Sequence, residues 1–124
     1  MIGKVCWIVT PYYDSSKQRN SFKSRPALII GAPDSGDYNI LPISRVTIKS
    51  NLDANYDLQI DPAKYPLLNL KSTSYIRVHK QTCVHMAAVS FPPIGDMKTD
   101  YPDLFLHVME KLEEYNEKLI NNAL

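Results

Sequence analysis

The residues best suited to chemistry in this sequence are an arginine and a serine at the ends of two apolar runs. Arg25 precedes the run Pro26–Gly31, and Ser44 follows the run Tyr38–Ile43. The intervening Ala32–Asp37 is rich in turn-forming residues, so the two runs predict a β-hairpin. Because the start of one hairpin strand lies beside the end of its partner, we expect Arg25 and Ser44 at one rim. A guanidinium fork suits phosphate oxygens, and a hydroxyl can donate a hydrogen bond to the same oxygens.

The segment before Arg25 is polar and mixes cations with aromatic rings. Its fourteen residues, Pro11–Ser24, predict an irregular loop, because Pro11 cannot continue a central strand. The cations offer charge for phosphate and the rings offer flat faces for bases, which suits a single-stranded nucleic acid. The residues concerned are Lys17, Arg19, Lys23, Tyr12, Tyr13 and Phe22. A merely solvated loop is the alternative.

A third group of polar residues comes from Ser74–Val89, which contains no glycine or proline and predicts a long strand that bends. Lys80 interrupts the apolar face of this strand, so we expect it at the rim of the sheet or at a bulge. His79 could transfer a proton near neutral pH, and the alternative is a structural or surface histidine. By alternation, the polar face carries Tyr75, Arg77, His79 and Gln81.

These residues need a framework of short strands. A turn or short helix is expected within Asp61–Leu70. Several short strands with turn residues between them, followed by a single helix, predict a small, strongly curved antiparallel sheet or barrel. The strands are expected at Lys4–Val9, Pro26–Gly31, Tyr38–Ile43, Asp57–Ile60 and within Ser74–Val89.

The C-terminal segment predicts a helix from Asp100 to Asn121, with Asp100 as the N-cap and Pro102 in the first turn. One face of this helix is apolar and is expected to cover an open side of the sheet. The whole chain, residues 1–124, is expected to form one mainly β domain with this C-terminal helix. The apolar positions recur every three or four residues, at Leu104, Val108, Leu112, Tyr115 and Leu119.

Composition is that of a globular domain, with 44% hydrophobic and 22% charged residues. No apolar run approaches the roughly 20 residues of a membrane-spanning helix, and the first residues lack the features of a signal peptide. We therefore expect a cytoplasmic protein that does not enter the membrane. Cys6 and Cys83 lie in strand-like stretches without metal-ligand spacing, so we expect no metal site and two small buried side chains.

Charge is divided along the chain. Residues 1–50 hold seven Lys or Arg and three Asp, a balance of +4, whereas residues 91–124 hold three Lys and seven Asp or Glu, a balance of −4. The positive first part could attract a polyanion, and the acidic tail could not.

The order of these segments resembles the MazF/PemK family of toxin ribonucleases. The resemblance implies an SH3-like barrel that forms a homodimer and cuts single-stranded RNA at short sequences without a metal or other cofactor. It also implies a partner protein, an antitoxin, that neutralises the enzyme. The matching segments span most of the chain: G-K-V-C-W-I-V-T-P, a long polar loop, R-P-A-L-I-I, a turn, L-P-I-S, and later S-Y-I-R-V-H-K-Q-T.

Residue by residue, the resemblance places the family's catalytic arginine on Arg25 and its hydroxyl residue, usually threonine, on Ser44. The family's glutamine in the later strand falls on Lys80, with Gln81 one place away. We therefore expect Arg25 and Ser44 to be catalytic. A wider set is expected to bind substrate: Lys17, Arg19, Phe22, Lys23, Arg77, His79, Lys80 and Gln81.

The expected reaction is attack of an RNA 2′-hydroxyl on the adjacent phosphate, giving a 2′,3′-cyclic phosphate and a 5′-hydroxyl end. It needs in-line positioning and stabilisation of the extra negative charge, which Arg25 can supply. Two alternatives remain open. One is a non-catalytic toxin like CcdB, which poisons DNA gyrase and would act through the last residues of the terminal helix. The other is a nucleic-acid-binding barrel without chemistry.

A cytoplasmic ribonuclease would attack the messages of its own cell, so a restraining partner is expected. The positive surface that binds RNA would also attract an acidic inhibitor. We expect a small acidic antitoxin, disordered when free, that folds along this surface and competes with RNA.

Overall fold

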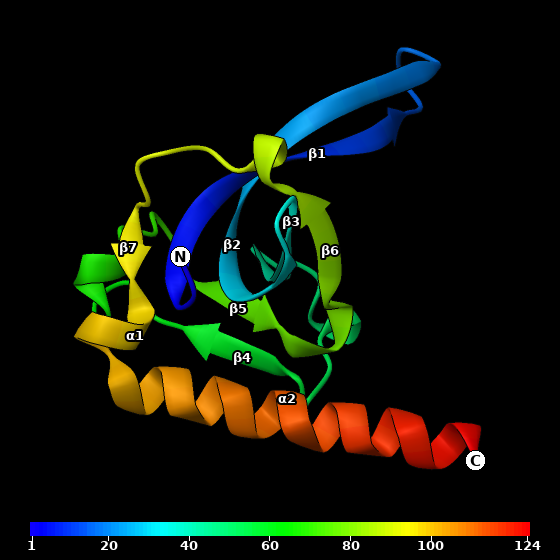
Figure 1. Ribbon diagram of the computed structural model, residues 1–124. Helices are drawn as coiled ribbons and strands as arrows, with labels where there is room; N and C mark the ends of the chain where they lie inside the picture. Colours follow the sequence, from blue (N-terminus) through cyan, green and yellow to red (C-terminus); the bar gives the residue numbers. More distant parts are fainter.

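The computed structural model describes residues 1–124 and consists of one curved antiparallel sheet with a long helix lying across it (Figure 1). The strands are β1 (Lys4–Asp14), β2 (Arg19–Asp34), β3 (Asp37–Ser44), β4 (Asp57–Ile60), β5 (Ser74–Arg77), β6 (Thr82–His85) and β7 (Gly95–Asp96). The helices are α1 (Met97–Asp100) and α2 (Pro102–Ala123). Single 3₁₀ turns occur at η1 (Lys49–Asn51), η2 (Pro66–Leu68), η3 (Val78–Lys80) and η4 (Met86–Ala88).

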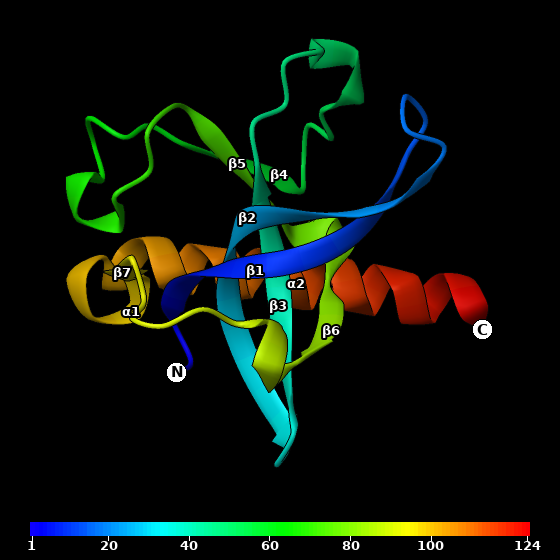
Figure 2. The ribbon, with the colours of Figure 1, turned by 90° about the horizontal axis from the view of Figure 1, so that it is seen from above.

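The strand order is β4-β5-β3-β2-β1-β7, and β6 also pairs with β3. The sheet curls into half of a barrel, which confirms the predicted fold class of a mainly β chain with a C-terminal helix (Figure 2). No helix of the chain has the length and apolar character needed to cross a membrane.

The predicted hairpin between β2 and β3 is confirmed. Ala27 lies opposite Pro42, and Asp34 lies opposite Asp37 across the turn. Asp34 Oδ1 accepts a hydrogen bond from the Gly36 N–H at 3.2 Å, which fixes the turn. Turn chemistry and the apolar runs together determine this pairing.

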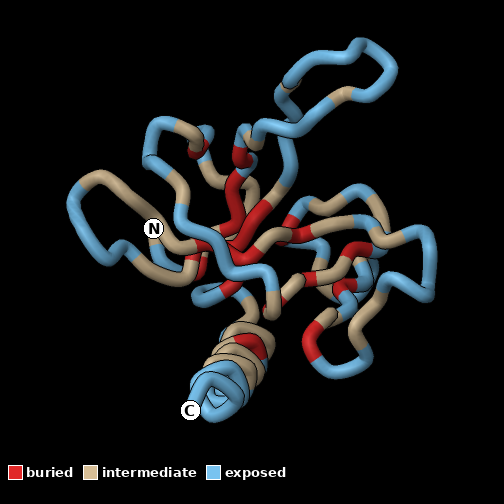
Figure 3. Tube along the Cα trace, turned by 90° about the vertical axis from the view of Figure 1, so that its right-hand side faces the viewer, coloured by how far each residue is buried: buried red, intermediate tan, exposed pale blue.

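The prediction of an irregular loop at Pro11–Ser24 is wrong. Both strands continue past the body of the sheet as a two-stranded arm, residues 9–24, which projects from the molecule (Figures 1 and 3). The pairing runs without a register shift from Val5 opposite Leu28 to Asp14 opposite Arg19.

Pro11 is tolerated in this arm because its ring lies on the unpaired edge. The carbonyls of Val5 and Trp7 point away from β2, since they accept hydrogen bonds from the N–H groups of Ile94 (2.8 Å) and Ser90 (2.9 Å). Alternate residues of a strand direct their backbone groups to the same side, so the nitrogen of Pro11 also faces away from β2. No ladder hydrogen bond is lost there.

The predicted bend in Ser74–Val89 is confirmed, and it is a 3₁₀ turn. β5 pairs Ile76 with Ile43, whereas β6 pairs Thr82 with Ile40 on the same strand β3. The turn η3 separates β5 from β6, so that two short strands, and not one long strand, pair with the same edge of β3.

The main core lies between the sheet and α2. Val108 of α2 and Met97 of α1 are fully buried against β1 to β5, together with residues such as Leu28, Ile43 and Ile76. Burying each such side chain contributes about 1.5–3 kcal/mol. Gly95 allows β7 to approach this core closely, because a Cβ there would lie 2.9 Å from Leu68 Cα.

A second, smaller core lies on the opposite face of β1 to β3 and contains Cys6, Ile8, Ile29 and Ile40. Burial on both faces explains why the run Pro26–Gly31 is apolar without alternation. Cys6 is buried as predicted. Cys83 was expected to be buried too, but it is exposed on β6, whose inward residue is Val84.

The helix begins differently from the prediction. Asp96, not Asp100, accepts a capping hydrogen bond from the Thr99 N–H (3.2 Å) at the start of α1. Asp100 ends α1, and α2 then starts at Pro102 in its first turn, as predicted, without a side-chain cap. The C-terminal end of α2 extends past the sheet, so Leu119 is exposed although it follows the apolar period (Figure 1).

Candidate functional site

A pocket of about 490 Å³ lies where three segments meet: the base of the arm at residues 23–26, the end of β3 with residues 43–47, and residues 69–74 before β5. The loops that follow β3 and β4 project from the same edge of the sheet as the arm (Figure 2). The pocket is therefore built from parts of the chain that only the curvature of the sheet brings together.

Arg25 and Ser44 both line this pocket, as the hairpin geometry predicted. Arg25 lies on β2 opposite Ile8 of β1, where the arm leaves the body. Ser44 is the last residue of β3 and lies opposite Tyr75 of β5. Ala27 of β2 pairs with Pro42 of β3. Arg25 lies two residues before Ala27 and Ser44 lies two residues after Pro42, so in this antiparallel pair they occupy corresponding positions.

The pocket is cationic. It has four basic residues, and none of the chain's 13 Asp and Glu residues lines it. None of these four cations forms an ion pair, so their charges remain available to a ligand. They are Lys23, Arg25, Arg45 and Lys71.

The rest of the lining offers hydrogen bonds and one aromatic ring. The ring belongs to Trp7, the only tryptophan of the chain. Hydroxyl groups come from Ser24, Ser44, Thr47, Ser72 and Ser74. Cations and hydroxyls without carboxylates favour a ligand with several anionic oxygens, and the exposed indole adds a surface on which a base can stack.

The predicted substrate-binding residues divide into three places. Lys23 lines the pocket, whereas Lys17, Arg19 and Phe22 lie farther out along the arm. Lys80 and Gln81 lie at the junction of β5 and β6, where they are exposed and outside the pocket lining. Lys80 sits in a turn at the sheet's rim, one of the two placements expected for it.

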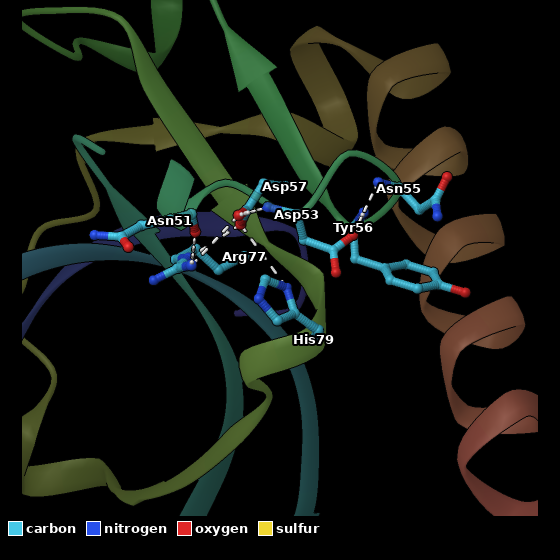
Figure 4. Close-up of polar contacts among 7 residues, drawn as sticks. All are labelled: Asn51, Asp53, Asn55, Tyr56, Asp57, Arg77 and His79. Atoms are coloured by element: carbon cyan, nitrogen blue, oxygen red, sulfur yellow. Dashed lines mark hydrogen bonds and ion pairs between the residues drawn. The ribbon is translucent and has the colours of Figure 1, made fainter. Parts of the chain in front are cut away.

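Arg77 and His79 were expected to bind substrate, but the structure engages both with Asp57 of β4 (Figure 4). The Asp57 side chain is fully buried. Its Oδ1 accepts from Arg77 Nε at 3.0 Å and lies 3.8 Å from His79 Nδ1. Neither Arg77 nor His79 lines the pocket, so the face that they share by alternation is turned toward Asp57 instead.

Asp57, Arg77 and His79 form a cluster, the Asp57 cluster, which holds the loop that carries part of the pocket. Arg77 Nη2 donates to the carbonyl oxygen of Asn51 at 3.2 Å, and Asp57 Oδ2 accepts from the Asp53 N–H at 2.8 Å. Asp53 in turn accepts from the N–H groups of Asn55 and Tyr56, and these two hydrogen bonds lower the pKa of its carboxyl group. The loop of residues 45–56 is thus anchored at its far end.

Several pocket residues escaped the sequence reasoning. Arg45 directly follows Ser44 and could have been found, because the end of β3 was already the expected site. Lys71 and Thr47 lie in loops, where spacing gives no indication of spatial neighbours. Trp7 was placed in a strand without a role.

No group of three or more His, Cys, Asp or Glu side chains gathers to form a metal site. No protein-family model matches the sequence. No curated protein matches it either. The pocket chemistry is therefore the observation on which a function has to be argued.

Proposed function

We propose that this chain binds single-stranded RNA in the pocket and cleaves it in the cytoplasm, as an endoribonuclease of the toxin type. The observation that carries the proposal is the composition of the pocket: four unpaired cations, five hydroxyl groups and no carboxylate around Arg25 and Ser44. Such a lining suits the phosphodiester backbone, because its cations attract phosphates and no carboxylate of the lining repels them.

In the proposed reaction the 2′-oxygen of one nucleotide attacks its own 3′-phosphorus, and the bond from phosphorus to the 5′-oxygen of the next nucleotide breaks. The 2′-hydroxyl proton leaves and the departing 5′-oxygen gains one. Arg25 and Ser44 donate hydrogen bonds to the phosphate oxygens, where negative charge grows in the transition state. Lys23, Arg45 and Lys71 hold the flanking phosphates in line.

The test is cleavage of a single-stranded RNA by the purified chain in EDTA. Arg25→Ala should lower the rate about a hundredfold or more, because it removes a donor aimed at developing charge. Ser44→Ala should have a milder effect. Lys64→Ala is the matched control, since this cation lies outside the pocket and stacks on Tyr65. An Arg25→Ala protein that cuts at the wild-type rate would refute the assignment.

Binding without cleavage is the second candidate, and one observation favours it: no histidine and no carboxylate lines the pocket. An enzyme of this type would have to pass its protons to water or to the substrate itself, since arginine and lysine are poor bases when charged. RNA that is bound by the wild-type chain, released intact, and bound more weakly by Arg25→Ala would establish this second function.

We also propose two protein partners that the resemblance and the charge map suggest. One is a second copy of the chain, in a homodimer. The other is a small acidic antitoxin that binds the cationic pocket and competes with RNA, which a competition titration with a labelled RNA would detect.

A further inference from the structure

The arm has two chemically different faces. In an antiparallel ribbon, directly opposite residues share a face, and the face alternates along each strand. Trp7 lies opposite Pro26, Pro11 opposite Phe22, and Tyr13 opposite Asn20. These pairs belong to one face. Ile8 opposite Arg25, Thr10 opposite Lys23, and Asp14 opposite Arg19 belong to the other.

The first face is an apolar, largely aromatic stripe that is open to solvent. Tyr13 is 62% exposed and Phe22 is 72% exposed, and Trp7 and Val9 are also exposed. Exposed apolar residues that line up on one surface indicate an interaction site, because a single exposed side chain is common but a continuous stripe is not. We define the aromatic stripe as Trp7, Val9, Pro11, Phe22 and Tyr13.

The second face is cationic. It carries Arg25, Lys23 and Arg19 at alternate positions of β2, with Asp14 as its only acidic residue. Lys17 adds a further cation in the turn at the tip. Positive charge therefore lies on the reverse side of the ribbon that carries the stripe, which favours an anionic partner with flat apolar groups.

The arm holds this arrangement by backbone pairing and by its turn rather than by a core. Asp14 Oδ1 accepts from the Ser16 hydroxyl at 2.6 Å and from the Ser16 N–H at 3.0 Å. The Thr10 hydroxyl donates to the carbonyl oxygen of Lys23 at 3.1 Å. A paired ribbon keeps the rings of Trp7, Tyr13 and Phe22 on one side, which an irregular loop would not do.

We propose that the aromatic stripe is a base-stacking track that receives the RNA strand as it leaves the pocket; this rests on the function proposed above. Trp7 joins the two sites, because it lines the pocket and begins the stripe. From Trp7 to Tyr13 the track is about 20 Å long, at about 3.3 Å per residue. The bases stack on the rings, and the cations of the opposite face attract the phosphates.

The track explains why the substrate would have to be single-stranded. Bases can stack on protein rings only when they are free of a partner strand, and stacking tolerates any base because every base has a flat face. Beside the rings, this face carries the polar side chains of Ser24 and Asn20, which are too few to read a run of base edges. The stripe therefore adds affinity and a preference for single strands, and any preference for particular bases would come from the pocket.

The test uses a non-cleavable probe, a 2′-O-methyl RNA octamer, so that binding is measured apart from cleavage. Trp7 is the single tryptophan, and its fluorescence should be quenched when a base stacks on it. Tyr13→Ala and Phe22→Ala should each weaken binding at least about fivefold. Tyr12→Ala is the matched control, because this adjacent tyrosine is 44% exposed but lies on the cationic face. It should weaken binding less than about twofold.

Four outcomes would overturn the track. Equal losses in Tyr12→Ala and Tyr13→Ala would show that the arm does not distinguish its faces. Unchanged octamer binding in Tyr13→Ala and Phe22→Ala, with RNA cleavage intact, would refute the track and leave the proposed function standing. The same unchanged binding with altered sedimentation would make the stripe a protein interface. A wild-type chain that neither binds the octamer nor cuts RNA would remove both proposals.

Discussion

Replacing Asp57 with alanine removes a buried carboxylate on which three other groups depend. The Asp57 side chain is fully buried, and it accepts hydrogen bonds from Arg77 Nε at 3.0 Å, Arg77 Nη2 at 3.3 Å and the Asp53 N–H at 2.8 Å. His79 Nδ1 lies 3.8 Å away and has no other partner. The variant leaves the guanidinium and the amide without their common acceptor, and it removes the carboxylate that faces the imidazole.

The size of the effect follows from how deeply these groups are buried. Removing one partner of a buried ion pair costs about 3–5 kcal/mol, because the other charge is left uncompensated. The Arg77 side chain keeps 22% exposure and its hydrogen bond to the Asn51 carbonyl, so part of the cost is relieved by water. We expect Asp57→Ala to lower the free energy of unfolding by about 3 kcal/mol.

Urea unfolding followed by circular dichroism measures this change. The control is Glu114→Ala, which removes the exposed pair with Lys111 (3.3 Å) on α2 and should cost less than about 0.5 kcal/mol. The slope of the free energy against urea should stay the same in both variants if only the folded state is affected. A loss below about 1 kcal/mol in Asp57→Ala, or one equal to the control, would refute the account of the cluster as a buried anchor.

Two further predictions concern groups whose surroundings differ sharply. Exposed Cys83 should react rapidly with a thiol reagent in the native protein, whereas Cys6 should react only after unfolding, because burial raises the pKa of its thiol and blocks access. Timed alkylation followed by mass spectrometry of the peptides measures the two rates. Equal rates of modification at both cysteines would contradict this prediction. The Ser16 hydroxyl lowers the pKa of Asp14 below its ordinary value of 3.8, so the order of the arm's turn should persist above that pH and be lost as the pH falls through the lowered pKa. An NMR titration of the Ser16 amide with a midpoint at or above 3.8 would show that this hydrogen bond does not hold the turn in solution.

The parts of the fold that could be predicted are those where local chemistry and packing agree. The β2–β3 hairpin follows from a turn sequence between two apolar runs, and β4 has the predicted bounds, Asp57–Ile60. A bend was expected within Ser74–Val89, and the structure places it after Arg77. Each of these depends on residues that are neighbours in the sequence or in one hairpin.

The arm could not be predicted in this way. Its residues pack on no core, so burial imposes no alternation of apolar and polar types, and Pro11 argues against a strand. What fixes the arm is pairing with a partner strand that is itself polar, together with an unpaired edge where a proline ring is harmless. Composition still identified its chemistry, cations with aromatic rings, although it could not show which rings share a face.

The Asp57 cluster shows a second limit of sequence reasoning. Alternation put Arg77 and His79 on one face, which was right for a strand, but it could not show that Asp57, twenty residues earlier, occupies that face. Arg77, a cation near the expected site, was therefore predicted to bind substrate. The same ambiguity affects any basic residue on a strand, since the sequence does not reveal which carboxylate the fold brings to it.

Arg77 nevertheless bears on the pocket by another route. Its Nη2 donates to Asn51, and the loop held by that bond also carries Arg45 and Thr47 into the pocket lining. Loss of Arg77 would therefore loosen one wall of the pocket without removing a group that contacts the ligand. A variant at Arg77 that weakens RNA binding would consequently not show that Arg77 touches RNA. The two possible roles of Arg77 are to hold the loop and to contact RNA. Only a neutral side chain at this position that still donates a hydrogen bond to the Asn51 carbonyl could separate them, because the loop depends on that bond and RNA binding would depend on the cation.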